Sequence, residues 1–181
     1  MKKTTRTFAL LFVLIISCSE SQTQNKTVQK IRNTCRKIDS NLDTYQKKSV
    51  LWEEAEEGAE GTAYYKKGHL KMFHVSWRGE TGKKEINYYF NAKRQLIFQQ
   101  DNDYRYNRPI YYTKKIAAEN NDTEAYDPKK TTVQKQKYYF ENEELIHWID
   151  GHNNVVDLKY EKNTGKRLVS EMKELIQKIK K

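Results

Sequence analysis

Three residues close together in the sequence are of types that could perform acid–base or metal chemistry. His147, Asp150 and His152 carry imidazole and carboxylate groups, which are common zinc ligands and common proton-transfer groups. The alternative is a turn, because Gly151 follows Asp150 and two asparagines follow His152, and such residues favour tight turns. We favour the turn and expect no metal site, and we retain His147, Asp150 and His152 only as weak metal candidates.

Other catalytic patterns are missing from the sequence. It contains no glycine-rich phosphate loop, no G-x-S-x-G, no H-E-x-x-H and no C-x-x-C pair. The stretch Asp101-Asn102-Asp103 begins like a calcium-binding loop, but Arg105 stands at a ligand position and the required glycine is absent. We therefore expect a non-catalytic protein. The alternative is a small periplasmic hydrolase or a metal-dependent enzyme that uses His147, Asp150 or His152.

The most specific sequence motif in the chain surrounds Cys18, which follows an apolar run. Lys2, Lys3 and Arg6 form a positively charged start, and residues 8–16 (FALLFVLII) are all apolar. That run is shorter than the roughly 20 residues of a membrane-spanning helix, but it has the length of the apolar part of a secretory signal peptide. Residues 1–17 are therefore predicted to be a signal peptide.

The four residues Ile15-Ile16-Ser17-Cys18 closely resemble the lipobox of bacterial lipoproteins, in which an aliphatic residue, a tolerant position and a small residue precede the cysteine. The resemblance implies that the Cys18 thiol receives a diacylglyceryl group and that the signal is cleaved just before it. It also implies acylation of the new amine, for example by palmitate, and two or three acyl chains anchor a protein stably. The alternatives are an ordinary secretory signal with an unrelated cysteine, or a short membrane helix.

The same resemblance implies a location in the cell envelope, with membrane lipid as a partner through acylated Cys18 and no cofactor besides the covalent lipid. In the sorting of such lipoproteins, aspartate after the cysteine retains the protein at the inner membrane. Ser19 stands there, so we expect the outer membrane. Nucleic acid is not an expected partner, because an envelope lipoprotein rarely meets it.

The rest of the chain divides into a polar segment and one folded domain. Residues 18–26 lack apolar periodicity and are predicted to be a lipidated flexible tether, and residues 27–181 to be a single α+β domain. Its 13 Tyr, 6 Phe and 3 Trp supply bulky core side chains that a disordered chain would lack. Without the three basic residues of the signal, the formal charge falls from +10 to +7. These basic residues are scattered, which favours solubility over a dedicated anionic ligand.

Two segments have apolar residues at helical spacing. The first predicted helix runs from Thr27 to near Tyr45 and carries one apolar stripe: Val28, Ile31, Cys35, Ile38 and Leu42. The second begins at Gly165 and carries another: Leu168, Met172, Leu175, Ile176 and Ile179. Cys35 has no partner in the chain if Cys18 carries lipid. We expect it to be buried, the alternative being a disulfide between two chains.

Between the helices, two similar stretches predict aromatic β-hairpins. Tyr88-Tyr89-Phe90 and Tyr138-Tyr139-Phe140 each lead through a polar gap to a Leu-Ile pair. Strands are predicted near residues 62–66, 69–77, 83–91, 94–100, 132–142 and 144–150, with further short strands at 110–112 and 155–160. Short connections make neighbouring strands antiparallel. The fold class is therefore α+β, with an N-terminal amphipathic helix, an antiparallel sheet of about six strands and a C-terminal amphipathic helix.

Alternation along the strands divides the aromatic residues between two faces. Tyr88, Phe90, Tyr138 and Phe140 are predicted to lie in the core, beneath both helices. The other face is predicted to be open, and with the tyrosine-rich connection it forms a candidate binding surface of Tyr89, Tyr139, Trp148, Tyr104, Tyr106, Tyr111 and Tyr112. The alternative is a partly solvated face without a binding role.

These features together predict a membrane-anchored envelope lipoprotein that binds another envelope protein or a glycan without catalysis. The layout is similar to that of small envelope lipoproteins of unknown function, and no more specific family is indicated. A third hypothesis is a purely structural anchor.

The lipid anchor can be tested directly in cells. We expect the protein to incorporate an alkyne analogue of palmitate, and we expect Cys18→Ala to abolish the labelling, because the resemblance places the acyl chains on this residue. Gel fluorescence after click coupling measures the label, and Cys35→Ala, which removes the other cysteine, should remain labelled. Labelling that survives Cys18→Ala would contradict the prediction.

Overall fold

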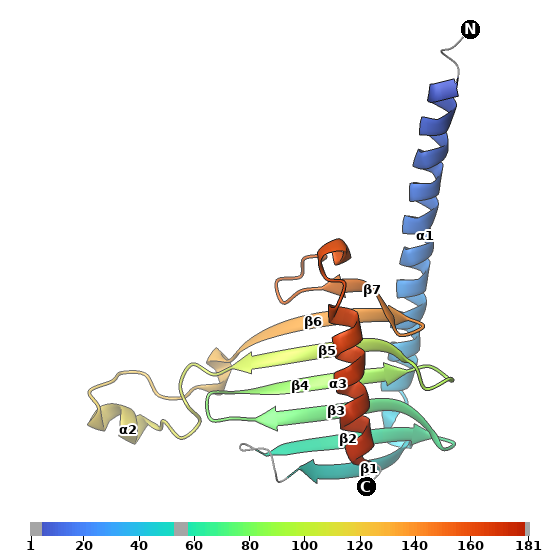
Figure 1. Ribbon diagram of the computed structural model, residues 1–181. Coiled ribbons are helices and arrows are strands. Elements are labelled where there is room, and N and C mark those ends of the chain that lie inside the picture. Colours follow the sequence, from blue (N-terminus) through green and yellow to red (C-terminus); the bar gives the residue numbers. More distant parts are fainter. Residues whose placement is uncertain (1–4, 53–57, 180–181) are drawn as a thin grey trace.

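The centre of the structure is an antiparallel sheet in which each strand pairs with the next strand along the chain. The computed structural model describes residues 5–52 and 58–179, with side chains described for residues 22–52 and 58–179. Within these residues the sheet has seven strands in the order of the sequence (Figure 1). They are β1 (Gln46–Trp52), β2 (Ala59–Lys66), β3 (His69–Arg78), β4 (Gly82–Phe90), β5 (Leu96–Arg105), β6 (Thr132–Glu141) and β7 (Glu144–Ile149).

The α+β class is confirmed, but the sheet has seven strands where about six were expected. The additional strand is β1, at one edge of the sheet. It begins directly after the predicted end of the first helix, near Tyr45, in a segment for which no strand was predicted. Only Val50 and Trp52 of β1 pack against the core, and two inward residues are too few to give a clear alternation of apolar and polar positions.

One face of the sheet is covered by α3 (Thr164–Ile179), which crosses the strands in front in Figure 1. The aromatic residues predicted for the core lie on this face, and each is at most 4% exposed: Tyr88, Phe90, Tyr138 and Phe140. Leu168, Val169 and Met172 of α3 belong to the same buried cluster. The apolar stripe of the C-terminal helix is therefore buried as its spacing predicts.

The opposite face is covered by α1 (Thr5–Asp39), so the expectation that both helices share one face was wrong. α1 lies behind the sheet in Figure 1. Among its described side chains, the buried ones are Val28, Ile31, Cys35 and Ile38. The strand residues in the same cluster are Met72, Tyr89, Ile97, Phe98 and Tyr139. Because the strands carry apolar side chains on both faces, each face requires its own covering layer.

The boundaries of α1 also differ from the predicted ones. The helix ends at Asp39 and not near Tyr45, and a short 3₁₀ turn, η1 (Leu42–Thr44), leads into β1. Its backbone is helical through residues 18–26, the segment predicted to be a flexible tether. The division into signal peptide, tether and domain remains a prediction. In the described part of the chain, no helix combines the length and the apolar character needed to cross a bilayer.

Two short segments predicted as strands have other conformations. Val155 makes a single bridge to Ile149, and residues Leu158–Tyr160 form the 3₁₀ turn η3. Residues 110–112 lie in a turn in which the Tyr112 N–H donates to the Pro109 carbonyl oxygen at 2.9 Å.

Cys35 is buried, as predicted, and it is a free thiol. It lies between α1 and the sheet with Ile31 and Ile38 in the same cluster. Burial, with a smaller contribution from the Asp39 charge, raises the pKa of the thiol to about 12. Since the thiolate is the reactive form, this thiol should be inert at neutral pH.

Removing one aromatic ring tests the α3 side of the core. Phe140→Ala should lower the free energy of unfolding by about 3–5 kcal/mol, because it leaves a cavity where a ring is now 1% exposed. Urea denaturation measures the change. Val133→Ala on the same strand removes a side chain that is 41% exposed and should change the stability by less than about 0.5 kcal/mol. Similar losses for both variants would contradict this packing.

Candidate functional site

Two tyrosines predicted to form an open binding surface are buried beneath α1. Tyr89 is 7% exposed and Tyr139 is 2% exposed. The Tyr89 hydroxyl donates to Asp39 Oδ1 at 2.8 Å, and the Tyr139 hydroxyl accepts from Arg32 Nε at 3.0 Å. These hydroxyls fasten α1 to the sheet. The prediction that Tyr89 and Tyr139 form an open binding surface was therefore wrong, because both residues pack against a helix.

Trp148 lies on the other side of the sheet from these tyrosines. Its ring is 5.3 Å from the ring of Tyr138, and it packs half-buried against the cluster beneath α3. A register shift between Tyr139 and Phe140 changes which residues of β7 face each side. Trp148 therefore does not extend a surface that contains Tyr89 and Tyr139.

His147 lies in β7 (Glu144–Ile149), and Asp150 and His152 lie in the turn that follows it. Asp150 Oδ1 accepts from the backbone N–H groups of His152 and Asn154 at 2.9 and 2.8 Å. The His147 ring lies 5.4 Å from the Tyr139 ring in a tilted arrangement, and burial together with the Arg32 charge lowers its pKa. No group of three potential metal ligands is found within the residues that the structure describes.

The remaining predicted residues lie at one end of the sheet, where the chain leaves β5 and returns to β6. We call residues 106–131 the arm. It projects beyond the strand ends and carries α2 (Lys114–Glu119) at its far part (Figure 1). Tyr106, Tyr111 and Tyr112 belong to the arm, and Tyr104 lies just before it in β5. The structure thus brings these four tyrosines to one region and separates them from the other three predicted residues.

Backbone hydrogen bonds hold the base of the arm against the turn between β3 and β4. The N–H of Tyr106 donates to Thr81 O at 2.9 Å, and the N–H of Ile110 donates to Glu80 O at 2.8 Å. Asn107 ties the two sides of the arm together. Its amide donates to Ala125 O at 3.0 Å and accepts from the Asp127 N–H at 3.0 Å.

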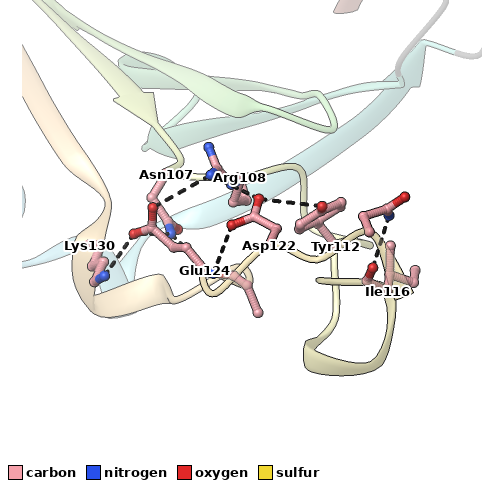
Figure 2. A network of polar contacts seen from close by, with 9 residues as sticks. Asn107, Arg108, Tyr112, Ile116, Asp122, Glu124 and Lys130 are labelled. Atoms are coloured by element: carbon pink, nitrogen blue, oxygen red, sulfur yellow. Dashed lines mark hydrogen bonds and ion pairs between the residues drawn. The ribbon is translucent and has the colours of Figure 1, made fainter. Parts of the chain in front are cut away.

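A network of charged side chains joins the outgoing and returning halves of the arm (Figure 2). Arg108 Nη2 lies 3.0 Å from Asp122 Oδ2 and 3.8 Å from Glu124 Oε2. Lys130 donates to Glu124 Oε1 at 2.7 Å, and the Tyr112 hydroxyl donates to Asp122 Oδ2 at 3.4 Å. Several mutually supporting contacts of this kind hold an exposed segment in one shape more effectively than one isolated pair.

The two carboxylates of this network are stabilised in their charged forms. The Glu124 N–H, followed by the Arg108 charge, holds the pKa of Asp122 below its ordinary value of 3.8. Hydrogen bonds from Lys130 and Asn107 hold the pKa of Glu124 below 4.5. Because both pKa values are lowered in the folded state, their contribution to stability is complete at neutral pH. It is lost only as the pH falls through these lowered values, below about 4.

The arm presents two apolar side chains to solvent next to this rigid base. Ile110 is 51% exposed and Tyr111 is 53% exposed. Pro109 precedes them, and its fixed φ angle limits the freedom of the turn. Large exposed apolar side chains on an ordered projection are typical of protein-binding surfaces.

Beside the base of the arm lies a hollow of about 490 Å³ whose lining combines aromatic rings with charged side chains of both signs, Asp103 being the acid. Trp77, Lys83, Lys84, Tyr104, Arg105 and Tyr106 contribute to it. The Lys83 ammonium lies 4.3 Å from the centre of the Tyr104 ring, and the Tyr104 hydroxyl donates to Glu85 at 2.8 Å. Burial and Glu85 raise the pKa of Tyr104 to about 12, so the hydroxyl remains a proton donor at neutral pH.

The tyrosines of this region are predicted from the sequence, whereas the residues that complete it are not. Ile110 was assigned to a short strand, and Arg108 was not singled out. Trp77 and Lys83 flank a turn rich in glycine, residues 79–82. That turn was the available signal, since residues on both sides of a hairpin turn come together at one end of a sheet.

Breaking the network should loosen the arm without unfolding the sheet. Arg108→Ala should accelerate amide hydrogen exchange in residues 106–131 by about two- to fivefold, since partly exposed ion pairs each contribute about 0.2–1 kcal/mol. Mass spectrometry of deuterium uptake measures the effect. Arg78→Ala breaks a 2.6 Å pair with Glu60 on the sheet and should leave exchange in the arm unchanged. Unchanged exchange in Arg108→Ala would show that the network does not hold the arm.

Comparison of the chain with protein-family models, with curated proteins and with solved structures finds no match.

Proposed function

We propose that this protein is a lipid-anchored lipoprotein of the bacterial cell envelope and acts as a non-catalytic binding module. The anchor is acylated Cys18, supported by its lipobox-like context, and Ser19 supports the outer membrane as the location. The binding partner is another protein of the envelope. The arm is the part of the domain that contacts it.

The observation that carries this proposal is the exposed pair Ile110 and Tyr111 on an ordered projection. The arm is fastened to the β3–β4 turn and braced by the network around Arg108 and Asp122. A braced surface loses little conformational entropy on binding, which leaves more of the contact energy available for affinity. Tyrosine beside an aliphatic residue is also a frequent composition of the centre of a protein interface.

A glycan is the second candidate partner, favoured by the hollow at the base of the arm. Its lining offers flat aromatic surfaces beside charged side chains of both signs. Concave sites with a few polar groups suit small ligands or the end of a chain. The three cations of the lining each form an ion pair with a carboxylate, so the aromatic rings are the main feature that favours a sugar.

No observation favours the rival hypothesis of a small hydrolase or metal-dependent enzyme. Asp150 is occupied in capping a turn, and His147 packs against Tyr139. In the described geometry these groups serve the fold.

Photo-crosslinking in intact cells tests the role of the arm. A photoreactive amino acid at position 111 should crosslink to a specific envelope protein, because the Tyr111 side chain is exposed on the arm. Ile110→Ala combined with Tyr111→Ala should weaken binding of the captured protein about 30-fold, as expected for losing about 2 kcal/mol of contact energy. Affinity is measured with the purified partner.

The matched control is Leu51, an exposed apolar residue on the edge strand β1 that is 74% exposed. A crosslinker at position 51 should not capture the same protein, and Leu51→Ala should bind it normally. Equal capture from both positions, or unchanged affinity of the double variant with an unchanged unfolding transition, would refute a role for the arm. Capture of a polysaccharide from position 111 would favour the glycan.

A further inference from the structure

The path of α1 fixes which edge of the domain lies close to the predicted anchor. Among the described side chains of α1, which begin at residue 22, Val28 is the first that is buried in the core. Before it, the Gln24 side-chain amide donates to the backbone carbonyl oxygen of Ile146 in β7. The helix therefore leaves the domain beside β7, the strand at the edge of the sheet opposite β1 (Figure 1).

The chain between this contact and Cys18 is short. The six residue steps from Cys18 to Gln24 span about 9 Å as a helix and about 20 Å when fully extended. The β1 edge is farther away, because six strand spacings of about 4.8 Å separate it from β7 by about 29 Å. An acyl chain on Cys18 consequently holds the β7 edge close to the bilayer.

The connection between β7 and α3, residues 150–163, occupies this same edge in Figure 1. Two large side chains of this connection point into solvent: Val155 is 67% exposed and Tyr160 is 77% exposed. The Lys159 ammonium lies 5.6 Å from the centre of the Tyr160 ring. Tyrosine and lysine together are characteristic of the headgroup region of membranes, where an amphipathic ring and a flexible cation both find suitable surroundings.

The connection carries two lysines that can contact phospholipid headgroups and three carboxylates, so its formal charge is −1 with His152 neutral. Its carboxylates are engaged locally: Asp150 and Asp157 accept backbone N–H groups, and Glu161 accepts from the Thr164 hydroxyl at 2.7 Å. Lys159 and Lys162 have no ion-pair partner in the described part of the chain. Each free cation near an anionic membrane surface is attracted by about 1 kcal/mol.

We propose that Val155, Lys159, Tyr160 and Lys162 form a membrane-contact surface that rests on the phospholipid headgroups and orients the domain with β7 towards the bilayer. This orientation rests on the proposed acylation of Cys18. It adds to that anchor a second, weaker contact made by the folded domain itself. The arm leaves the sheet between β5 and β6, so it lies nearer the bilayer than the β1 edge does.

Fluorescence quenching by brominated lipids tests the contact. The acylated protein is purified from membranes and reconstituted in vesicles with and without bromine on the acyl chains, as the variants Tyr160→Trp and Tyr111→Trp. The fluorescence of the unsubstituted protein is subtracted to remove the signal of the native tryptophans. The remaining fluorescence, from the tryptophan at position 160, should fall by at least about twofold in brominated vesicles. The fluorescence added at position 111 should remain unchanged.

The two proposals fail in different ways. Intact mass of the purified protein reports the acyl chains independently of quenching, and a mass without them would overturn both the anchor and the orientation. Acyl chains without quenching at position 160, or equal quenching at positions 160 and 111, would overturn the membrane-contact surface alone. Unchanged thermal unfolding of both variants shows that the domain remains folded in the comparison.

Discussion

Burial of aromatic side chains on both faces of one sheet is the constraint on which the structure depends. A single sheet with one apolar face needs one covering layer, whereas this sheet needs two. α3 covers the face of Tyr88 and Phe140, and α1 covers the face of Tyr89 and Tyr139. Each face therefore has its own covering helix, and the large exposed apolar side chains of the described residues lie on the edge strand β1, near the arm and in the connection between β7 and α3.

The sequence predicts which residues of a strand or helix are buried better than it predicts which face of the sheet each helix covers. Period-two alternation correctly separates Tyr88 from Tyr89, and helical spacing correctly marks the buried stripe of α3. Alternation fails at bulges, because one extra residue reverses the faces that follow. Such a shift lies between Tyr89 and Phe90, and it places Phe98 beneath α1 although Leu96 lies beneath α3.

The arm shows a second limit of local sequence patterns. Its tyrosines were visible in the sequence, because they gather between two predicted strands. Its shape was not visible, because contacts between residues distant in sequence determine it: Arg108 meets Asp122, and Ile110 bonds to the β3–β4 turn. Composition can therefore locate a candidate surface, whereas only the pairing of distant residues shows that the surface is held rigid.

α1 links the packing of the sheet to the position of the domain, because the same helix covers one face and leads towards the predicted anchor. An anchor on a flexible tether would leave the domain free to rotate above a membrane. Here the helix is fastened by Tyr89 and Tyr139 and passes β7 at Gln24, so the freedom left to the domain is that of the few residues before Gln24. With Cys18 acylated, as proposed, the packing that buries Tyr139 also determines which edge of the sheet faces the lipid. The arm then projects from a domain whose orientation is already restricted, which lowers the entropy lost when it binds a partner in the same envelope.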